Sequence, residues 1–403
     1  MSTRTSRQSP STLVALAFCM ALQMTGYAMV LPLFARRFDN LGAGVGALGA
    51  SAVAYALAST LAAPFMGMLA DRFGRRPIVL FSLAAYALAS CGYLLAASAW
   101  QLILLRGLAG AFIAGLLLAM TSIVGDVAPE NRRAQWVGIV NGGASVGWIV
   151  GPLLGGFLYD RFGYFVPFAA PIAIAVGALL LAVFLIRETY TPAAHRSHRH
   201  LAGTLELYVL PARPAFFLLM LISFGVMFAS GFSEPQFQFY AYDGLSWTSS
   251  QLGLVMSAYA VAFMLGEFGL GQLSDRLGRK PVLVLGLALF SAQFIGLVIF
   301  RDLTWIVVSF VLAGLGNALY DPALIAFILD ITPPDLTARI IGLKGTAGSL
   351  GGMLGPALIV LFTPTSPRAV FLTATAFVFL LTLAAGLVLR LPRDLHSVRS
   401  PAV

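Results

Sequence analysis

Long apolar runs, separated by short polar or Pro/Gly-rich breaks, fill most of the chain. The runs are continuous, as in LISFGVMFASGF at 221–232, whereas the strands of a membrane β-barrel alternate between apolar and polar residues. A helix needs about 20 apolar residues to cross a bilayer. The pattern therefore predicts twelve membrane-spanning helices, near 12–35, 45–69, 77–97, 100–124, 133–158, 165–187, 214–240, 249–272, 281–300, 303–328, 339–362 and 368–390.

The composition agrees with this interpretation. Of the 403 residues, 59% are hydrophobic and only 10% are charged, whereas a soluble domain carries about 25% charged residues because its surface faces water. These values disfavour a soluble enzyme, a disordered protein and a nucleic-acid-binding domain. The formal charge of +9 would suit a nucleic acid, but basic residues that flank membrane spans explain it better. We expect an all-α membrane protein in a lipid bilayer, with no nucleic-acid partner.

The distribution of basic residues predicts the orientation. Most of the 25 Lys and Arg residues fall in segments on the same side as the two termini. The opposite side holds only Arg36, Arg37, Arg161, Arg301 and Arg368. Cytoplasmic loops carry the excess of Lys and Arg, so we expect both termini in the cytoplasm and the protein in a bacterial inner membrane.

The chain divides into two halves that repeat each other. The polar stretch 188–213 separates residues 1–187 from 214–403, with six expected spans in each half. GMLADRFGRRP at 67–77 returns as GQLSDRLGRKP at 271–281, and the same ungapped offset relates Gly151-Pro152 to Gly355-Pro356. A six-span repeat keeps its orientation, so the halves should be related by a two-fold axis along the membrane normal, with the substrate bound between them.

Three histidines, His195, His198 and His200, lie in the stretch 188–213. Their spacing could bind a metal ion, but no cysteine or carboxylate joins them at ligand spacing. We interpret the stretch as a solvated basic loop and expect no metal site. GASVG at 143–147 matches a hydrolase motif, but it lies in an apolar span and all four histidines lie in the loop or the tail, so no catalytic triad is expected.

Three motifs resemble the major facilitator superfamily, and the resemblance covers essentially the whole chain. GMLADRFGRRP is similar to the signature between the second and third helices, and LILLRGLAG, with Arg106, is similar to that of the fourth. GWIVGPLLGG at 147–156 fits the fifth-helix pattern GxxxGPxxGG of the antiporters. Together they resemble the twelve-helix drug:proton antiporter branch. The resemblance implies efflux driven by a proton gradient, with no cofactor.

The loop motif predicts a cytoplasmic gate. Arg75 could pair with Asp126, and Asp71 could lie at a helix N-terminus of the other half, where the helix dipole favours an anion. Such contacts would hold the cytoplasmic side shut; the alternative is that the charges only set the topology. The expected gating residues of both halves are Asp71, Arg75, Asp126, Asp275 and Asp330.

The antiporter motif predicts a close, bent helix interface. Glycine lets two backbones approach closely, and Pro152 removes one helical hydrogen bond and bends the helix. A close interface between the halves could seal against a proton leak. The motif residues are Gly147, Gly151, Pro152, Gly155 and Gly156. The second half lacks the trailing glycine pair, so we assign no antiporter role to it.

Ionisable residues within membrane spans are costly and therefore functional candidates. The resemblance implies that the first, fourth, seventh and tenth helices line the cavity, and Arg106, Glu234 and Asp321 lie on three of them. We expect Glu234 and Asp321 to carry the coupled protons and Arg106 to tune the site. The alternative for Asp321 is a structural ion pair with Lys344. Glu267 ranks lower, because it lies near the cytoplasmic end of its span.

A proline follows each expected proton carrier. Pro235 comes directly after Glu234, and Pro322 directly after Asp321. Because proline cannot donate a helical hydrogen bond, we expect both helices to be broken there, with free carbonyls that help to hold the ligand.

The expected substrate cavity is large and lipophilic. Flexible methionine and flat aromatic side chains suit bulky, varied ligands, although for any single phenylalanine lipid contact or core packing is the stronger alternative. Polar residues near the middle of their spans could orient a ligand. The candidate cavity residues are Gln23, Tyr27, Asn141, Phe228, Phe232, Gln236 and Asn317.

The sequence thus predicts a proton-coupled antiporter, active as a monomer, that exports lipophilic drug-like compounds by alternating access. The first alternative is an exporter of one metabolite, such as a sugar, an amino acid or a lipid precursor. The second is a non-transporting membrane sensor or scaffold.

Overall fold

The computed structural model describes residues 10–189, 214–270, 273–332, 336–361 and 366–389. The regular elements within these ranges are all helical, which confirms the expected fold class. Most of the stretch 188–213, including the three histidines, lies outside the described residues. The helices of the first half are α1 (Pro10–Val30), α2 (Phe34–Asn40), α3 (Val45–Phe73), α4 (Arg75–Leu95), α5 (Ala99–Val127), α6 (Arg133–Phe162) and α7 (Phe165–Leu185).

The second half repeats this series with additional breaks. Its helices are α8 (Pro214–Phe239), α9 (Ser249–Leu270), α10 (Leu273–Leu277), α11 (Arg279–Phe290), α12 (Ala292–Ile299), α13 (Leu303–Ile331), α14 (Thr337–Leu361) and α15 (Pro367–Val388). Within the described ranges, eleven helical segments are long and apolar enough to cross a membrane. The helix α14 completes the expected twelve, and Lys344 and its many glycines lower its hydropathy.

Two expected spans consist of two helices each. The first span is divided by a 3-10 turn at Leu31–Leu33, where Pro32 lacks the N–H group that an α-helix needs. The ninth span is divided at Ser291, whose hydroxyl donates to the carbonyl oxygen of Ala288 at 2.7 Å. Such a local hydrogen bond competes with the helical ladder.

The expected helix breaks at Pro235 and Pro322 are absent. The helix α8 continues through Pro235, and α13 continues through Pro322. A buried proline removes one hydrogen bond, and the packing of neighbouring helices preserves the rest of the ladder. The helix α8 instead widens into a π-helical turn beyond its end, at Tyr240–Gly244.

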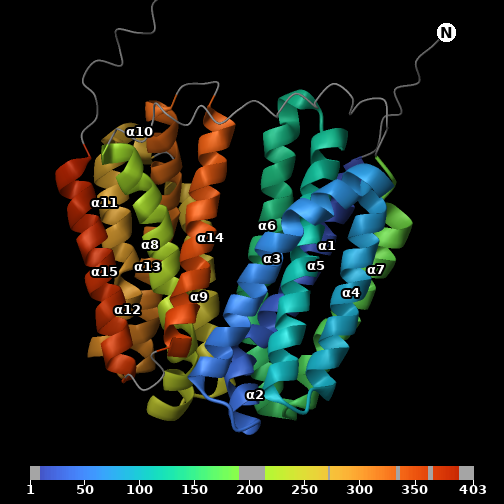
Figure 1. Cartoon of the computed structure of the whole chain (residues 1–403), viewed down its shortest axis with the longest axis horizontal. Coiled ribbons are helices and arrows are strands. Elements are labelled where there is room, and N and C mark those ends of the chain that lie inside the picture. The colour runs from blue at the N-terminus through green and yellow to red at the C-terminus, as the bar shows by residue number, and fades with distance from the viewer. Residues whose placement is uncertain (1–9, 190–213, 271–272, 333–335, 362–365, 390–403) are drawn as a thin grey trace, which may run out of the picture.

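The two halves form separate helical groups that meet at one end of the molecule (Figure 1). One buried apolar cluster draws its buried members from residues 13–186, and two others draw theirs from residues 216–389. In the view of Figure 1 the ribbons of the halves approach each other near α2 and diverge toward α10. We call the end that carries the α3–α4 turn and α10 the motif end, and the opposite end the far end.

The repeat is visible in the backbone of the two motif turns. Gly74 has φ +97°, and Gly278, its counterpart in the second half, has φ +92°. Residues with a Cβ atom rarely adopt such positive φ values. These glycines directly precede α4 and α11, so the same glycine turn begins the corresponding helix of each half.

Candidate functional site

Two glycine contacts join the halves near the far end. A Cβ atom placed on Gly49 of α3 would lie 3.1 Å from the carbonyl oxygen of Pro356 in α14. A Cβ atom on Gly253 of α9 would overlap the carbonyl oxygen of Pro152 in α6. The internal repeat relates the two contacts to each other. In both places, one helix backbone of each half touches the backbone of the other half.

Polar contacts reinforce this junction. Asp160, at the end of α6, accepts hydrogen bonds from the main-chain N–H groups of Ser249 (3.0 Å) and Ser250 (2.7 Å), the first residues of α9. A carboxylate at a helix N-terminus also interacts favourably with the helix dipole. This contact therefore binds α6 of the first half to α9 of the second.

Arg36 forms a second polar link at the far end. Its Nη2 donates to the carbonyl oxygen of Trp247 at 3.1 Å, and its guanidinium lies 4.1 Å from the ring centre of Tyr242. The hydroxyl of Tyr242 in turn donates to the carbonyl oxygen of Pro32 at 2.8 Å. Together with the contacts of Asp160, these interactions hold the halves together at the far end.

The charged residues of the motif end form ion pairs within each half. Arg75 of α4 pairs with Asp126 of α5, and Arg279 of α11 pairs with Asp330 of α13 at 3.2 Å. The repeat again relates the two pairs. Arg279 also pairs with Asp275, in the position that corresponds to Asp71. The pair expected for Arg75 and Asp126 is thus present.

Asp71 is exposed, and no hydrogen bond or ion pair of its side chain is found within the described part of the chain. Its expected contact with a helix N-terminus of the other half is therefore not made in this conformation. Glu188 instead lies at a helix N-terminus of its own half. Its carboxylate accepts hydrogen bonds from the main-chain N–H groups of Arg75 (3.0 Å) and Arg76 (3.2 Å), the first residues of α4. The gating role of Asp71 stays a prediction.

Most of the antiporter motif packs α6 against α1 in the same half. A Cβ atom on Gly147 would lie 2.5 Å from Cβ of Met24, and one on Gly151 would lie 2.7 Å from Cβ of Ala28. Gly155 similarly lies against the backbone of α1, at Met29. Only Gly156 and Pro152 face α9 of the other half. The expected interface between the halves thus involves two motif residues, because helical spacing directs the other glycines to the opposite face of α6.

The second half retains this packing. Gly351 and Gly355 of α14 lie against the main chain of Phe224 and Phe228 in α8, as Gly147 and Gly151 lie against α1. The trailing glycine pair of the first-half motif has no counterpart in α14. The packing of the preceding two glycines is a structural feature that both halves share.

Arg106 of α5 is buried among aromatic rings. Arg106 is only 6% exposed. Its guanidinium lies 4.5 Å from the ring centre of Phe34 and 5.4 Å from that of Tyr55. Within the described ranges, its Nε and Nη1 atoms have no hydrogen-bond partner. A guanidinium is stabilised over aromatic faces by the ring quadrupoles. Glu234 of the other half is close enough to interact electrostatically with Arg106.

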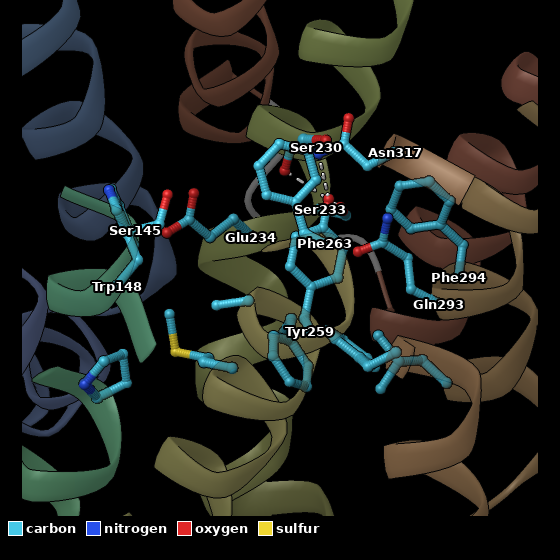
Figure 2. Close-up of a pocket in the computed structure, with 16 residues that line it drawn as sticks. Ser145, Trp148, Ser230, Ser233, Glu234, Tyr259, Phe263, Gln293, Phe294 and Asn317 are labelled. Carbon is cyan, nitrogen blue, oxygen red and sulfur yellow. Dashed lines mark hydrogen bonds between the residues drawn. The ribbon is translucent and has the colours of Figure 1, made fainter. Parts of the chain in front are cut away.

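A cavity of about 380 Å³, which we call the central cavity, lies between α6 of the first half and α8, α9, α12 and α13 of the second (Figure 2). Figure 2 shows the Glu234 side chain extending toward α6, which carries Ser145 and Trp148, while Gln293 and Phe294 lie on the opposite side. The aromatic lining residues are Trp148, Phe237, Tyr259, Phe263, Phe294 and Phe310. The polar ones, beside Glu234 and Tyr259, are Ser145, Ser230, Ser233, Gln293 and Asn317.

Three expected site residues line this central cavity: Glu234, Asn317 and Pro152 of the antiporter motif. Glu234 is exposed to it and accepts a long hydrogen bond, 3.4 Å, from Gln238. Asn317 donates to the hydroxyl of Tyr259 at 2.8 Å. Tyr27 contacts the cavity indirectly, because its ring lies edge-on to that of Trp148 at 5.7 Å.

The other expected cavity residues lie elsewhere. The rings of Phe228 and Phe232 stack at 5.9 Å, and Phe228 also packs on Phe377 of α15, so these two side chains contribute to helix packing. Gln236 and Gln23 are buried, and neither amide atom of Gln23 has a hydrogen-bond partner in the described part of the chain. Asn141 is exposed on α6, outside the lining of the central cavity.

The second expected proton carrier is engaged in an ion pair. Nζ of Lys344 lies 2.5 Å from Oδ1 of Asp321, which joins α14 to α13. Glu267 of α9 is exposed and interacts electrostatically with Asp321. The structure thus contains the ion pair that is the alternative to a proton-carrying role for Asp321.

Several lining residues, notably Trp148, Tyr259 and Phe263, were not predicted from the sequence. They lie on α6 and α9, which are not among the four helices that the resemblance assigned to the cavity. The internal repeat gave one indication of Tyr259, because the same aromatic residue, Tyr55, stands at the corresponding position of the first half. Apolar residues on a membrane helix can face lipid, a cavity or another helix, and their spacing alone does not decide among these.

Comparisons with known proteins agree with this architecture. A family model described as Major Facilitator Superfamily matches residues 14–242 and 219–402. The multidrug resistance protein MdtG of Klebsiella pneumoniae (strain 342) is 27% identical over 354 residues, which cover 85% of each chain. The class G tetracycline resistance protein of Vibrio anguillarum is 30% identical over 344 residues, 81% of this chain and 83% of that protein.

Solved structures show the same fold. The structure of the nucleoside transporter NupG, as a D323A mutant, has a TM-score of 0.79 at 12% identity, and the match covers 94% of this chain and 100% of that chain. A bacterial homologue of the human lysosomal transporter Spinster, in an inward-facing and occupied conformation, has a TM-score of 0.74 at 18% identity, with 93% and 96% covered.

Proposed function

Because this chain belongs to the major facilitator superfamily and is therefore a multi-pass membrane transporter, we propose that it exports lipophilic drug-like compounds in exchange for protons. The observation that carries the proposal is the position of Glu234. Its carboxylate faces a largely aromatic cavity at the junction of the halves and interacts electrostatically with Arg106 of the opposite half. The names of the multidrug and tetracycline resistance relatives support the same substrate class.

Glu234 is the proposed main proton carrier. A charged carboxylate within a membrane span, beside a largely aromatic cavity, is costly, and it becomes less costly when it binds a proton or a cation. A cationic substrate and a proton would therefore compete for the same group. Arg106 favours the ionised form of Glu234 and so assists release of the proton. Asp321 is the second proposed carrier, and Lys344 must release it before it can take up a proton.

Alternating access is the proposed mechanism. The contacts of Asp160 and Arg36 hold the halves together at the far end, while the Arg75 and Arg279 ion pairs at the motif end stay within their own halves. This arrangement fits a state that is closed at the far end. In the opposite state, the far-end contacts would separate and Asp71 would contact the other half.

The proposed location is a bacterial inner membrane, with both termini and the motif end in the cytoplasm. The basic residues near the motif end and the bacterial relatives support this orientation. Each chain contains both halves of the junction, so we propose that a monomer transports. Reporter fusions to the two termini test the orientation: a cytoplasmic reporter should be active at both, and a periplasmic reporter at neither.

The decisive experiment is transport into proteoliposomes under an imposed pH gradient. The panel contains tetraphenylphosphonium as a lipophilic cation, an uncharged lipophilic drug and a sugar. We expect gradient-dependent accumulation of the lipophilic compounds, abolished by a protonophore, and none of the sugar. Accumulation that is unaffected by the protonophore would refute proton coupling.

A second candidate function is export of a polar metabolite. The observation that favours it is the group of Ser145, Gln293 and Asn317, which together with Tyr259 offers several convergent hydrogen-bonding groups. A metabolite site needs such groups for orientation. Accumulation of the sugar, with none of the lipophilic compounds, would favour this candidate.

A further inference from the structure

The end of the central cavity that lies opposite Glu234 is a recess within the second half. Gln293 and Phe294 of α12 lie on that side (Figure 2). Three apolar side chains that line it, those of Phe294, Leu297 and Phe310, are only 1%, 4% and 6% exposed and belong to the buried apolar clusters of the second half. This end of the cavity therefore lies in the packed core of one half.

The first half carries different side chains at the corresponding positions. Tyr93 and Arg106, both buried, stand where the second half has Leu297 and Phe310. Ala89, also buried, stands where α12 carries its glutamine. The recess with an amide in its wall is thus a feature that distinguishes the second half from the first.

The amide of Gln293 is oriented by a neighbouring turn of the same span. Its Nε2 donates to the carbonyl oxygen of Phe290 at 3.2 Å. Because a carbonyl oxygen can only accept, the amide NH₂ group must face Phe290, and the amide oxygen remains as an acceptor. Figure 2 shows this side chain pointing into the cavity, toward the side on which Glu234 lies. Within the described ranges, Oε1 of Gln293 has no hydrogen-bond partner.

The other polar groups of the lining make the recess an acceptor of hydrogen bonds. Asn317 donates through Nδ2 to the hydroxyl of Tyr259 at 2.8 Å, and so also keeps its oxygen as an acceptor. No Lys or Arg lines the cavity among the described residues, and Glu234 is its single carboxylate there. A ligand that places an O–H or N–H group in the recess gains a hydrogen bond, whereas an apolar group leaves a buried acceptor unpaired, which is costly.

We propose that Gln293 is a specificity-determining residue, which selects cationic substrates that carry a hydroxyl or N–H group on the end of the molecule remote from the charge. The ammonium group of such a substrate pairs with Glu234, its aromatic body packs against Tyr259 and Phe263, and its donor reaches Oε1 of Gln293. The proposal rests on the function proposed above and narrows its substrate class. Binding requires no gradient, so the selection can be measured apart from transport.

The test is competition for tritiated tetraphenylphosphonium bound to the purified full-length protein, without a pH gradient. The competitors are 4-hydroxytamoxifen and tamoxifen, two lipophilic amines that differ only in one hydroxyl, on a ring remote from the amine. The measured quantity is the ratio of their inhibition constants. The two compounds partition differently into detergent, and comparison of this ratio between parent and variant cancels that difference.

We expect Gln293→Leu to reduce the advantage of 4-hydroxytamoxifen at least threefold, because one neutral hydrogen bond contributes a factor of about two to ten. The affinity for tetraphenylphosphonium should change less than twofold, since this cation has no hydrogen-bonding group, and its retention shows that the variant is folded. If Gln293→Leu does not fold, Gln293→Met carries the same expectation. A ratio that stays at the parental value in the folded variant would overturn the proposal.

Two further variants separate the roles of the two ends. Gln135→Leu makes the same change at an exposed position of α6 outside the cavity and should leave the ratio at the parental value. Glu234→Gln should weaken the binding of both amines and of tetraphenylphosphonium alike, with the ratio within twofold of the parental one. A ratio that collapses in Glu234→Gln would mean that the hydroxyl binds at the carboxylate end, and the proposal would fail.

Transport measurements distinguish this proposal from the function on which it rests. If the ratio responds to Gln293→Leu as expected but no pH-driven transport of either amine occurs, the selection is confirmed and only the export function fails. If transport is proton-driven but the ratio is insensitive to Gln293→Leu, only the selection by Gln293 fails.

Discussion

Nζ of Lys344 and Oδ1 of Asp321 lie 2.5 Å apart, and this ion pair connects α14 to α13. The Asp321 side chain is 38% exposed and that of Lys344 17%, so the pair is intermediate between a surface pair and a buried one. Removing one partner costs about 3–5 kcal/mol in a buried pair and about 0–1 kcal/mol in an exposed one. The loss here should fall between these limits.

The first prediction concerns this ion pair. Asp321→Asn should lower the thermal stability of the detergent-purified protein, because Lys344 loses its partner, and Lys344→Gln in the same chain should restore it. Differential scanning fluorimetry measures both changes. If the double variant also recovers pH-driven transport, Asp321 is a structural partner. If stability recovers without transport, Asp321 carries protons.

The second prediction concerns Glu234. Glu234→Gln removes the titratable group but keeps the size of the side chain, so accumulation of tetraphenylphosphonium driven by a pH gradient should fall at least tenfold. Asp39→Asn is the control, because Asp39 is an exposed carboxylate on α2 outside the central cavity. The transport rate of this variant should stay within twofold of the parental rate. Parental transport by the Glu234 variant would contradict the proton-carrier assignment.

The third prediction concerns the antiporter motif. Gly151→Leu should separate α6 from α1, because even a Cβ atom at this position would approach Ala28 too closely. Overpacking typically costs about 1–3 kcal/mol, and we expect lower thermal stability together with reduced transport. Gly142→Leu, on the same helix with no atom within 4 Å of a Cβ, is the matched control. Equal stability of the two variants would show that the close packing is unimportant.

The fourth prediction compares two aspartates of the motif end. Asp126→Asn should destabilise the protein by breaking the pair with Arg75, whereas Asp71→Asn should leave its stability unchanged, because Asp71 is exposed and makes no ion pair among the described residues. Both should slow transport without preventing membrane insertion. Normal turnover of the Asp71 variant would argue against a gating role.

The fifth prediction concerns the far end. Asp160→Ala removes the acceptor for the first N–H groups of α9, so the closed far end should become less populated. Spin labels at Asn40 and Arg301, exposed positions of opposite halves, report the separation, after replacement of Cys19 and Cys91. We expect a larger fraction of long distances than in the parent. An unchanged distribution would mean that this contact does not hold the halves together.

The sequence predicted the fold almost completely, because continuous apolar runs and an ungapped repeat leave few alternatives for a membrane chain. It was wrong about helix breaks at Pro235 and Pro322, since the cost of one lost hydrogen bond depends on tertiary packing that a sequence does not display. It identified Glu234 and Asn317 as cavity residues through their polarity. It missed Trp148 and Phe263, because an aromatic residue on a membrane helix gives no sign of which way it faces.

Arg36 and Asp160 illustrate the same limit for charged residues. In the sequence, Arg36 contributed to the charge count of the outer loops and Asp160 had no assigned role. Their contacts join segments of opposite halves that are distant along the chain, Asp160 to Ser249 and Arg36 to Trp247, and no local pattern encodes these pairs.

The paired contacts of Gly49 with Pro356 and of Gly253 with Pro152 have a mechanical consequence. The internal repeat relates the two contacts to each other, and we infer that the line through them is the pivot of the motion between the halves. One half can rotate relative to the other about this line while both backbone contacts persist. Because the pivot lies nearer the far end, a small opening there corresponds to a larger displacement at the motif end. When the far-end contacts of Asp160 and Arg36 separate, the halves therefore move less there than they do at the motif end.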